Sequence, residues 1–213
     1  MERSYKYLGY FLLLMLPLIF FAFYKPYISK FPDFGVNFDK TKHIHAFIAS
    51  LWVLTLILQP FFIINKKIAW HRTIGKASYV LFPLLIFSFL PGIIKLYKSS
   101  DFRNMFFPVG DCIVLIILYS LAIYYRKKPV KHMRFIIAST LTLLGPTVGR
   151  ILPIWFGMGD VSTQTIQYLA TFGILLSLIL YDRKNKRNFK PYVIATYLFA
   201  AHAVVFYILF YEN

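Results

Sequence analysis

The stretch QPFFIINKKIAWHRTIG, from Gln59 to Gly75, joins the end of one apolar run to the start of the next through a basic turn. The turn carries two lysines and is followed by His71 and Arg72. Apolar runs of about 20 residues that are separated by short basic connections are typical of helices that cross a hydrocarbon core. This stretch therefore predicts two consecutive transmembrane helices with a positively charged turn between them.

The composition indicates the same class of protein. Of the 213 residues, 59% are apolar and only 15% are charged, with 24 basic against 8 acidic residues. Soluble domains carry about 25% charged residues, so a soluble globular domain is excluded. A net charge of +16 would suggest a nucleic-acid partner in a soluble protein, but here the basic residues lie in short clusters between apolar runs. We therefore interpret the charge as a signal of membrane topology and expect no nucleic-acid partner.

Seven apolar segments of spanning length follow one another along the chain. They lie near residues 8–24, 44–64, 74–96, 106–125, 134–155, 163–181 and 192–211. A segment in lipid must satisfy its own backbone hydrogen bonds, and these runs are too long and continuous for barrel strands. We predict an all-α polytopic transmembrane bundle of seven helices that forms a single domain over residues 1–213.

Basic residues concentrate in the connections after the second, fourth and sixth apolar runs. They are, in order, Lys66, Lys67, Arg72 and Lys76; Arg126, Lys127, Lys128, Lys131 and Arg134; and Arg183, Lys184, Lys186, Arg187 and Lys190. Since cytoplasmic connections carry an excess of Lys and Arg, we expect these connections on the cytoplasmic side. The amino terminus then lies in the cytoplasm and the carboxyl terminus outside, in a multi-pass protein of the inner, cytoplasmic membrane.

The connection from Lys25 to Lys42 is long and holds two prolines, a glycine and several aromatic residues. We expect a structured interfacial loop there and not a separate domain. Prolines also occur inside the apolar runs, at Pro83, Pro91 and Pro146. Neighbouring helices can satisfy the carbonyls that such prolines leave free, so we expect kinked but continuous helices.

Ionisable residues at membrane depth are costly, so they carry the functional argument. Asp111 and Arg150 fall at matched depth in the outer halves of the fourth and fifth predicted helices, which favours a buried ion pair over a substrate or proton site. His202 is flanked by alanines, which let another helix or a flat cofactor approach closely. The single Cys112 excludes an internal disulfide and a multi-thiolate metal site.

Histidine pairs lead to two cofactor hypotheses. His45 and His202 are candidate outer ligands of a haem, although along upright helices their depths differ by roughly 8 to 10 Å. For each of them the alternative is a hydrogen bond to a neighbouring helix. His43 and His45 are candidate ligands of a zinc or iron ion, together with a carboxylate, if residues 41–46 are extended. On a helix the two side chains would point about 200° apart.

A second polar layer falls at the predicted cytoplasmic helix ends. It comprises Gln59, His71, Arg72, His132 and Arg134. Arginine presents a fork that suits phosphate or carboxylate oxygens, and histidine adds a titratable donor, so this layer could bind a quinone, another small hydrophobic substrate or a lipid headgroup. The alternative is an ordinary interfacial anchor in the lipid bilayer.

Several of these residues fall into a recognisable pattern. It consists of His45-Ala46, Gln59-Pro60, His71-Arg72-x-x-Gly75, His132-x-Arg134 and Arg150. Over roughly residues 43–155 the pattern resembles a family of predicted multi-pass bacterial membrane proteins of unknown function. That family has a His-x-x-Trp-Met-x-Arg helix start, whereas here Met133 follows His132 directly and the Trp is missing.

The resemblance implies a set of residues that act together. They are His45, Gln59, His71, Arg72, His132, Arg134 and Arg150. A looser likeness to membrane b-type cytochromes and ferric-reductase-like proteins, which are also helical bundles with intramembrane histidines, implies haem as a cofactor.

Three functions follow from these observations. The first is a redox or cofactor-binding membrane protein that holds haem, a metal ion or a quinone, with cofactor contacts from His45, His202, His71 and His132. The second is a small transporter or an accessory subunit, in which Asp111 and Arg150 line a polar path or form a structural pair. The third is a lipid-handling enzyme that uses His71 and His132, and it is the least favoured because no nucleophile accompanies them.

Overall fold

The computed structural model describes residues 5–35 and 38–211 and is all-α. Helices make up 85% of the protein, and the described residues form no strand. The contacts within the chain divide it into two compact units, residues 1–100 and residues 101–213. The sequence predicts a single domain over residues 1–213, whereas the contacts within the chain form these two units.

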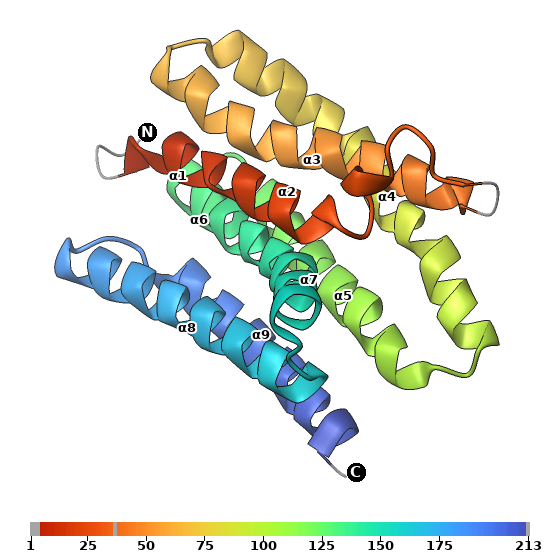
Figure 1. Cartoon of the computed structure of the whole chain (residues 1–213). Coiled ribbons are helices and arrows are strands. Elements are labelled where there is room, and N and C mark those ends of the chain that lie inside the picture. Colours follow the sequence, from red (N-terminus) through yellow and green to blue (C-terminus); the bar gives the residue numbers. More distant parts are fainter. Residues whose placement is uncertain (1–4, 36–37, 212–213) are drawn as a thin grey trace. The chain divides into compact units, whose positions relative to one another are not determined.

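The first unit consists of a split amino-terminal helix and a long helical hairpin. Its elements are α1 (Leu8–Leu13), α2 (Met15–Tyr24), the short 3-10 helix η2 (Ile28–Lys30), α3 (Lys40–Ile64) and α4 (Ile68–Lys98). α3 and α4 pack side by side, and α1 packs on α3. Figure 1 shows the short turn that joins α3 and α4.

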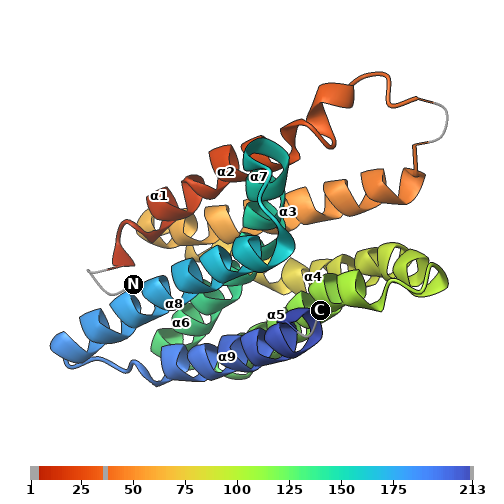
Figure 2. The ribbon, with the colours of Figure 1, turned by 60° about the horizontal axis from the view of Figure 1, so that its bottom comes forward.

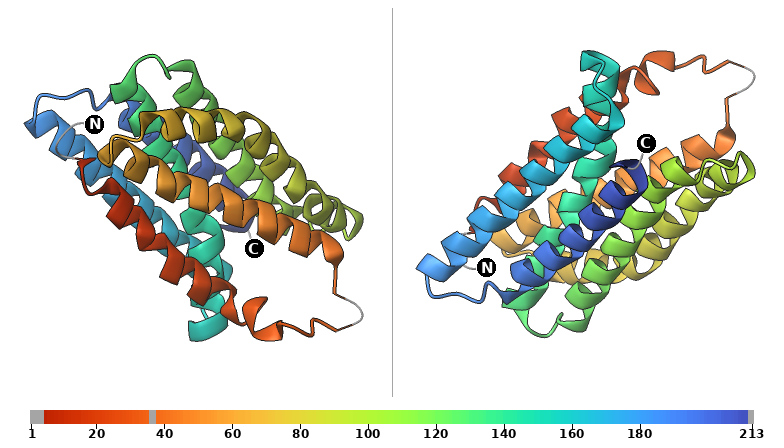
Figure 3. Two further views of the ribbon diagram at one scale, coloured as in Figure 1. Left: turned by 90° about the horizontal axis from the view of Figure 1, so that it is seen from above. Right: turned by 90° about the horizontal axis from the view of Figure 1, so that it is seen from below.

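The second unit begins with a hairpin and ends with one. Its elements are α5 (Phe102–Tyr124), α6 (Pro129–Thr140), η3 (Leu141–Leu143), α7 (Leu144–Phe156), α8 (Asp160–Lys184) and α9 (Lys190–Tyr211). α8 and α9 run side by side, as Figure 2 shows in blue. The turn between α5 and α6 and the turn between α8 and α9 lie at the same end of this unit (Figure 3).

Among residues 5–35 and 38–211, six helical segments are long and apolar enough to cross a membrane. They are Lys40–Ile64, Ile68–Lys98, Phe102–Tyr124, Pro129–Phe156, Asp160–Lys184 and Lys190–Phe210. The prediction of a helical, multi-pass membrane protein is therefore confirmed. The first predicted span is shorter and divided, because α1 ends at Leu13 and α2 starts at Met15.

The helices extend beyond the apolar runs from which they were predicted. α4 starts at Ile68 and not near residue 74, so His71 and Arg72 lie in its first turns. α6 starts at Pro129, a residue suited to the first helical position because its missing N–H would be unpaired there. The basic residues thus continue the helices, and the turns themselves are only a few residues long.

The prolines inside the apolar runs are compatible with continuous helices in α4, which runs through Pro83 and Pro91. At Pro146 the outcome differs, because the regular α-helix gives way to η3 at residues 141–143 and resumes as α7. The proline ring crowds the carbonyl four residues earlier, that of Thr142, which lies in η3. The expected irregularity at Pro146 is therefore a short 3-10 segment.

Candidate functional site

A buried polar cluster in the second unit involves three helices. Nε2 of His202, in α9, lies 3.7 Å from Oδ1 of Asp111, in α5. Nδ1 of His202 lies 2.8 Å from the hydroxyl oxygen of Tyr168, in α8. His202 and Tyr168 are buried, whereas the side chain of Asp111 is 22% exposed to solvent. The fold thus arranges a carboxylate, an imidazole and a phenol in one series.

The contacts of His202 suggest how its protons are distributed. A neutral imidazole carries one N–H. When the Tyr168 hydroxyl donates to Nδ1, the ring proton lies on Nε2, and the neighbouring acceptor there is the Asp111 carboxylate. A separation of 3.7 Å is too long for a hydrogen bond. A shift of about 0.5 Å would complete a hydrogen-bonded series from Tyr168 through His202 to Asp111.

Two glycines make this close approach possible. A Cβ atom on Gly110, in α5, would lie 2.6 Å from Nε2 of His202. A Cβ atom on Gly145, in α7, would lie 2.6 Å from Oδ2 of Asp111. Interiors packed at crystal density cannot absorb such overlaps without moving a side chain. Sequence analysis did not identify these glycines, although Gly110 directly precedes Asp111.

Asp111 and Arg150 also lie close enough to interact electrostatically. The guanidinium donates from Nη1 to the backbone carbonyl of Pro146, at 2.8 Å. The imidazole of His202 is a direct neighbour of the Asp111 carboxylate, a partner that sequence analysis did not assign. The polar cluster of the second unit therefore includes His202 as well as the expected acid and base.

A polar face on α8 is the other feature that sequence analysis missed. Thr163, Gln164, Gln167 and Thr171 are all buried, although α8 is one of the membrane-spanning helices. The available signal was their spacing of three to four residues, which places them on one face of a helix. α8 is also the least apolar of the six spans.

His43 and His45 do not come together in the first unit. Residues 40–64 are helical, so the extended conformation that a shared metal ion required is not present. Nδ1 of His43 lies 2.7 Å from the Tyr27 hydroxyl, and Nδ1 of His45 lies 2.9 Å from Oγ of Ser88. Within residues 5–35 and 38–211, no group of three or more His, Cys, Asp or Glu side chains is arranged to hold a metal ion.

The connection before α3 packs aromatic residues around His43. The ring of Phe34 lies 4.5 Å from the His43 ring between centroids, and that of Phe38 lies 4.9 Å away. Tyr27 adds its hydroxyl contact to the same imidazole. The described part of this connection is thus structured, and His43 is one of the residues that its aromatic rings contact.

The geometry at His202 does not fit a haem. His45 belongs to the first unit and His202 to the second. At His202 the Nε2 atom packs against Gly110 so closely that even a methyl group there would overlap it. A haem iron bound to Nε2 would need its flat ring where the α5 backbone lies. The packing at Gly110 therefore leaves no room for a haem at Nε2 of His202.

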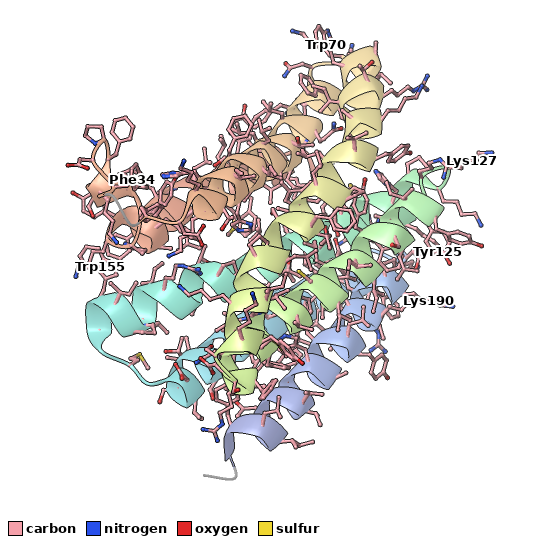
Figure 4. All side chains as sticks on the ribbon, turned by 90° about the vertical axis from the view of Figure 1, so that its right-hand side faces the viewer. Phe34, Trp70, Tyr125, Lys127, Trp155 and Lys190 are labelled. Carbon is pink, nitrogen blue, oxygen red and sulfur yellow. The ribbon has the colours of Figure 1, made fainter. Side chains whose placement is uncertain are left out.

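Gln59 and His71 meet at the turn of the α3–α4 hairpin. With its amide nitrogen facing His71, Gln59 donates to Nδ1 and to the backbone carbonyl of that residue, while its amide oxygen accepts from the backbone N–H of Gly75 at 3.2 Å. Three positions of the family-like pattern are therefore in contact. Arg72 is exposed nearby, and Trp70 marks the same end of the hairpin in Figure 4.

Arg134 has a different role from the one expected. We predicted a contact with a substrate or lipid headgroup, but its side chain is fully buried and binds Asp182 of α8. His132, two residues earlier, donates from Nδ1 to the carbonyl of Ala122 at 2.8 Å. Both residues lie at the end of the second unit where Figure 4 labels Tyr125, Lys127 and Lys190. The exposed lysines there remain available for lipid headgroups.

No family model, curated protein or solved structure matches this chain.

Proposed function

We propose that this chain is a small transporter of the cytoplasmic membrane that moves protons, alone or with a solute, through the Asp111–His202 pair. The observation that carries the proposal is the series from Tyr168 through His202 to Asp111, in which the phenol and the imidazole are buried and the carboxylate is partly exposed. Ionisable groups at membrane depth are costly to keep and commonly form proton relays. Here two of them face each other, with Arg150 as a nearby countercharge.

The chemistry that this pair supports is proton binding and release. A protonated His202 can pass the proton on Nε2 to the Asp111 carboxylate, in which case the N–H bond breaks and an O–H bond forms. The positive charge on the imidazole and the negative charge on the carboxylate then disappear together. When Asp111 is ionised, Arg150 balances its charge, which lowers the cost of holding a carboxylate away from water.

For the topology we propose seven spans, with the segment Leu8–Tyr24 as the first. The basic turns that follow α3, α5 and α8 lie on the cytoplasmic side, as does the amino terminus, and the carboxyl terminus lies outside. The clustering of Lys and Arg at these turns supports this orientation. The contact of Gln59 with His71 and Gly75 supports membership of the multi-pass family that the sequence resembles, because it joins three positions of the pattern.

Proton flux into liposomes tests the proposal. Purified protein is reconstituted, a potassium diffusion potential drives proton entry, and an internal pH-sensitive dye reports it. We expect Asp111→Asn to abolish the flux and His202→Gln to reduce it, while Asp160→Asn, at an exposed acid at the start of α8, leaves it unchanged. Normal flux in Asp111→Asn, with only stability reduced, would mean that the pair is structural, as in an accessory subunit.

A specific observation also favours the redox or cofactor-binding function as a second candidate. An apolar pocket of about 250 Å³ lies between α3 and α4, and its polar lining consists of Thr41 and Ser88. Ser88 contacts Nδ1 of His45. This open apolar groove offers contacts to a small hydrophobic substrate such as a quinone, with the hydroxyl groups as hydrogen-bond partners for its oxygen atoms. Purified protein without Soret absorbance, bound metal or retained quinone would remove this candidate.

A further inference from the structure

Four polar residues lie on the buried face of α8, and we name them the α8 polar row: Thr163, Gln164, Gln167 and Thr171. At most 3% of each of these residues is exposed. α8 packs against α7 and α9. The α8 polar row therefore lies inside the second unit, whereas Leu169 and Leu176 on the same helix are largely exposed.

Polar atoms of the α8 polar row lack hydrogen-bond partners within the described part of the protein. They are Oγ1 of Thr163, Oε1 of Gln167 and Oγ1 of Thr171. A buried amide or hydroxyl without a partner is unfavourable, and most such groups in proteins are paired. In a membrane helix apolar side chains would fill this face at no such cost. The row therefore indicates contact with something that both donates and accepts hydrogen bonds.

The row leads to the proposed proton site. From Thr163 to Thr171 it extends along α8 for about 12 Å, since each helical residue rises 1.5 Å. Tyr168 belongs to the same face and contacts His202 through its hydroxyl. Nε2 of His202 is itself a buried nitrogen without a hydrogen bond among the described residues. The unpaired atoms of α8 thus lie on the helix face that also carries Tyr168, the residue in contact with His202.

We propose that the α8 polar row is a hydrated path for protons between the amino-terminal end of α8 and the Asp111–His202 pair. Water fits the row because each molecule offers two donors and two acceptors to amides and hydroxyls of either kind. A chain of such molecules passes a proton by breaking one O–H bond as the next forms. That protons move along the row depends on the proposed function of the protein. That water occupies the row does not depend on it.

Hydration is tested by the reactivity of single cysteines with silver ions, which are small and stay in water. The chain has one thiol, so Cys112→Ala provides the background. Gln164→Cys, Gln167→Cys and Thr171→Cys are compared with Leu169→Cys and Leu176→Cys on the exposed side. A thiol ionises in water and not in apolar surroundings, so we expect the row to react at least about tenfold faster than the leucine positions. Equal or slower reaction at the row would overturn the proposal.

Conduction is tested by proton flux in Gln167→Leu, which keeps the volume but removes the amide. We expect a loss of about tenfold or more, because a proton in transit loses a hydrogen-bonding group at that point. Ser177→Ala, on an exposed part of α8, is the control and should leave the flux unchanged. Thr171→Val gives a second, nearly isosteric test if Gln167→Leu does not fold.

The outcomes separate the two proposals. A reactive row with unchanged flux in both Gln167→Leu and Thr171→Val would overturn the conduction path. A reactive row with normal flux in Asp111→Asn would instead refute the proposed function and leave the path hydrated. Fast reaction of the row cysteines with silver, together with reduced proton flux in Gln167→Leu, supports both the proposed function and the hydrated path.

Discussion

The guanidinium of Arg134 binds both carboxylate oxygens of Asp182, with Nε 2.6 Å from Oδ2 and Nη2 3.0 Å from Oδ1. Both side chains are fully buried. Nη1 of Arg134 also donates to the carbonyl of Val130, at 3.0 Å. This bidentate ion pair joins the middle of α6 to the end of α8, so it links two helices that are distant in sequence.

Removing the acid of this pair should strongly destabilise the protein. We expect Asp182→Asn to lower the free energy of unfolding by about 3–5 kcal/mol, because Arg134 would remain buried without its countercharge. Thermal unfolding in detergent micelles measures the change. Asp160→Asn, at the exposed other end of α8, should have little effect. An Asp182→Asn protein as stable as the parent would show that the ion pair contributes nothing to folding.

Two glycines of α7 offer a matched comparison. A Cβ on Gly145 would overlap the Asp111 carboxylate, whereas one on Gly149 would meet nothing within 4 Å. We expect Gly145→Ala to cost about 1–3 kcal/mol and to impair proton flux. Gly149→Ala should stabilise the helix by up to about 1 kcal/mol. Both changes are read from unfolding curves and liposome flux. If both variants have the same stability and the same proton flux, the close packing at Asp111 does not matter for either.

The contact between Gln59 and His71 should be visible as energetic coupling. Gln59→Leu, His71→Phe and the double variant form a thermodynamic cycle. We expect a coupling energy of about 1 kcal/mol, as for a typical hydrogen bond between side chains. Denaturant unfolding of the three variants provides the values. Effects that add to within about 0.3–0.5 kcal/mol would argue against a direct contact at the hairpin turn.

Asp39 provides a prediction about pH. Hydrogen bonds from the Thr41 hydroxyl, and then from the Thr41 backbone N–H, lower the pKa of this exposed carboxyl below its ordinary value of 3.8. Because the folded-state pKa is lowered, the cap stabilises α3 above the ordinary pKa and loses this effect as the pH falls through the lowered value. Thr41→Val should raise the pKa towards 3.8.

Carboxyl NMR signals followed through an acid titration give the pKa of Asp39 in each variant. Thr55→Val, a change at a threonine further along α3, is the control and should leave the titration of Asp39 as it is in the parent. A Thr41→Val protein in which Asp39 titrates as in the parent would mean that the hydroxyl does not hold the carboxylate.

The sequence alone predicts the class of fold. Six of the seven predicted spans are present as helices long and apolar enough for a membrane, because in lipid a run of apolar residues can satisfy its backbone only by forming a helix. The helix ends were harder to predict, since polar residues such as His71 and Arg72 continue a helix that apolar length alone would start later.

The sequence also identified which ionisable residues deserve functional tests, because Asp111, Arg150 and His202 stand out within apolar runs. The sequence also predicted the pairing of Asp111 with Arg150, whereas the partners of His202 and Arg134 came only from the tertiary structure. The sequence predicts Arg134 as an interfacial base, whereas the structure pairs it with the buried Asp182. The sequence predicts His202 as a cofactor ligand, whereas the structure packs it against Gly110 and Tyr168. Contacts between distant residues depend on how helices pack, which hydrophobic periodicity does not encode.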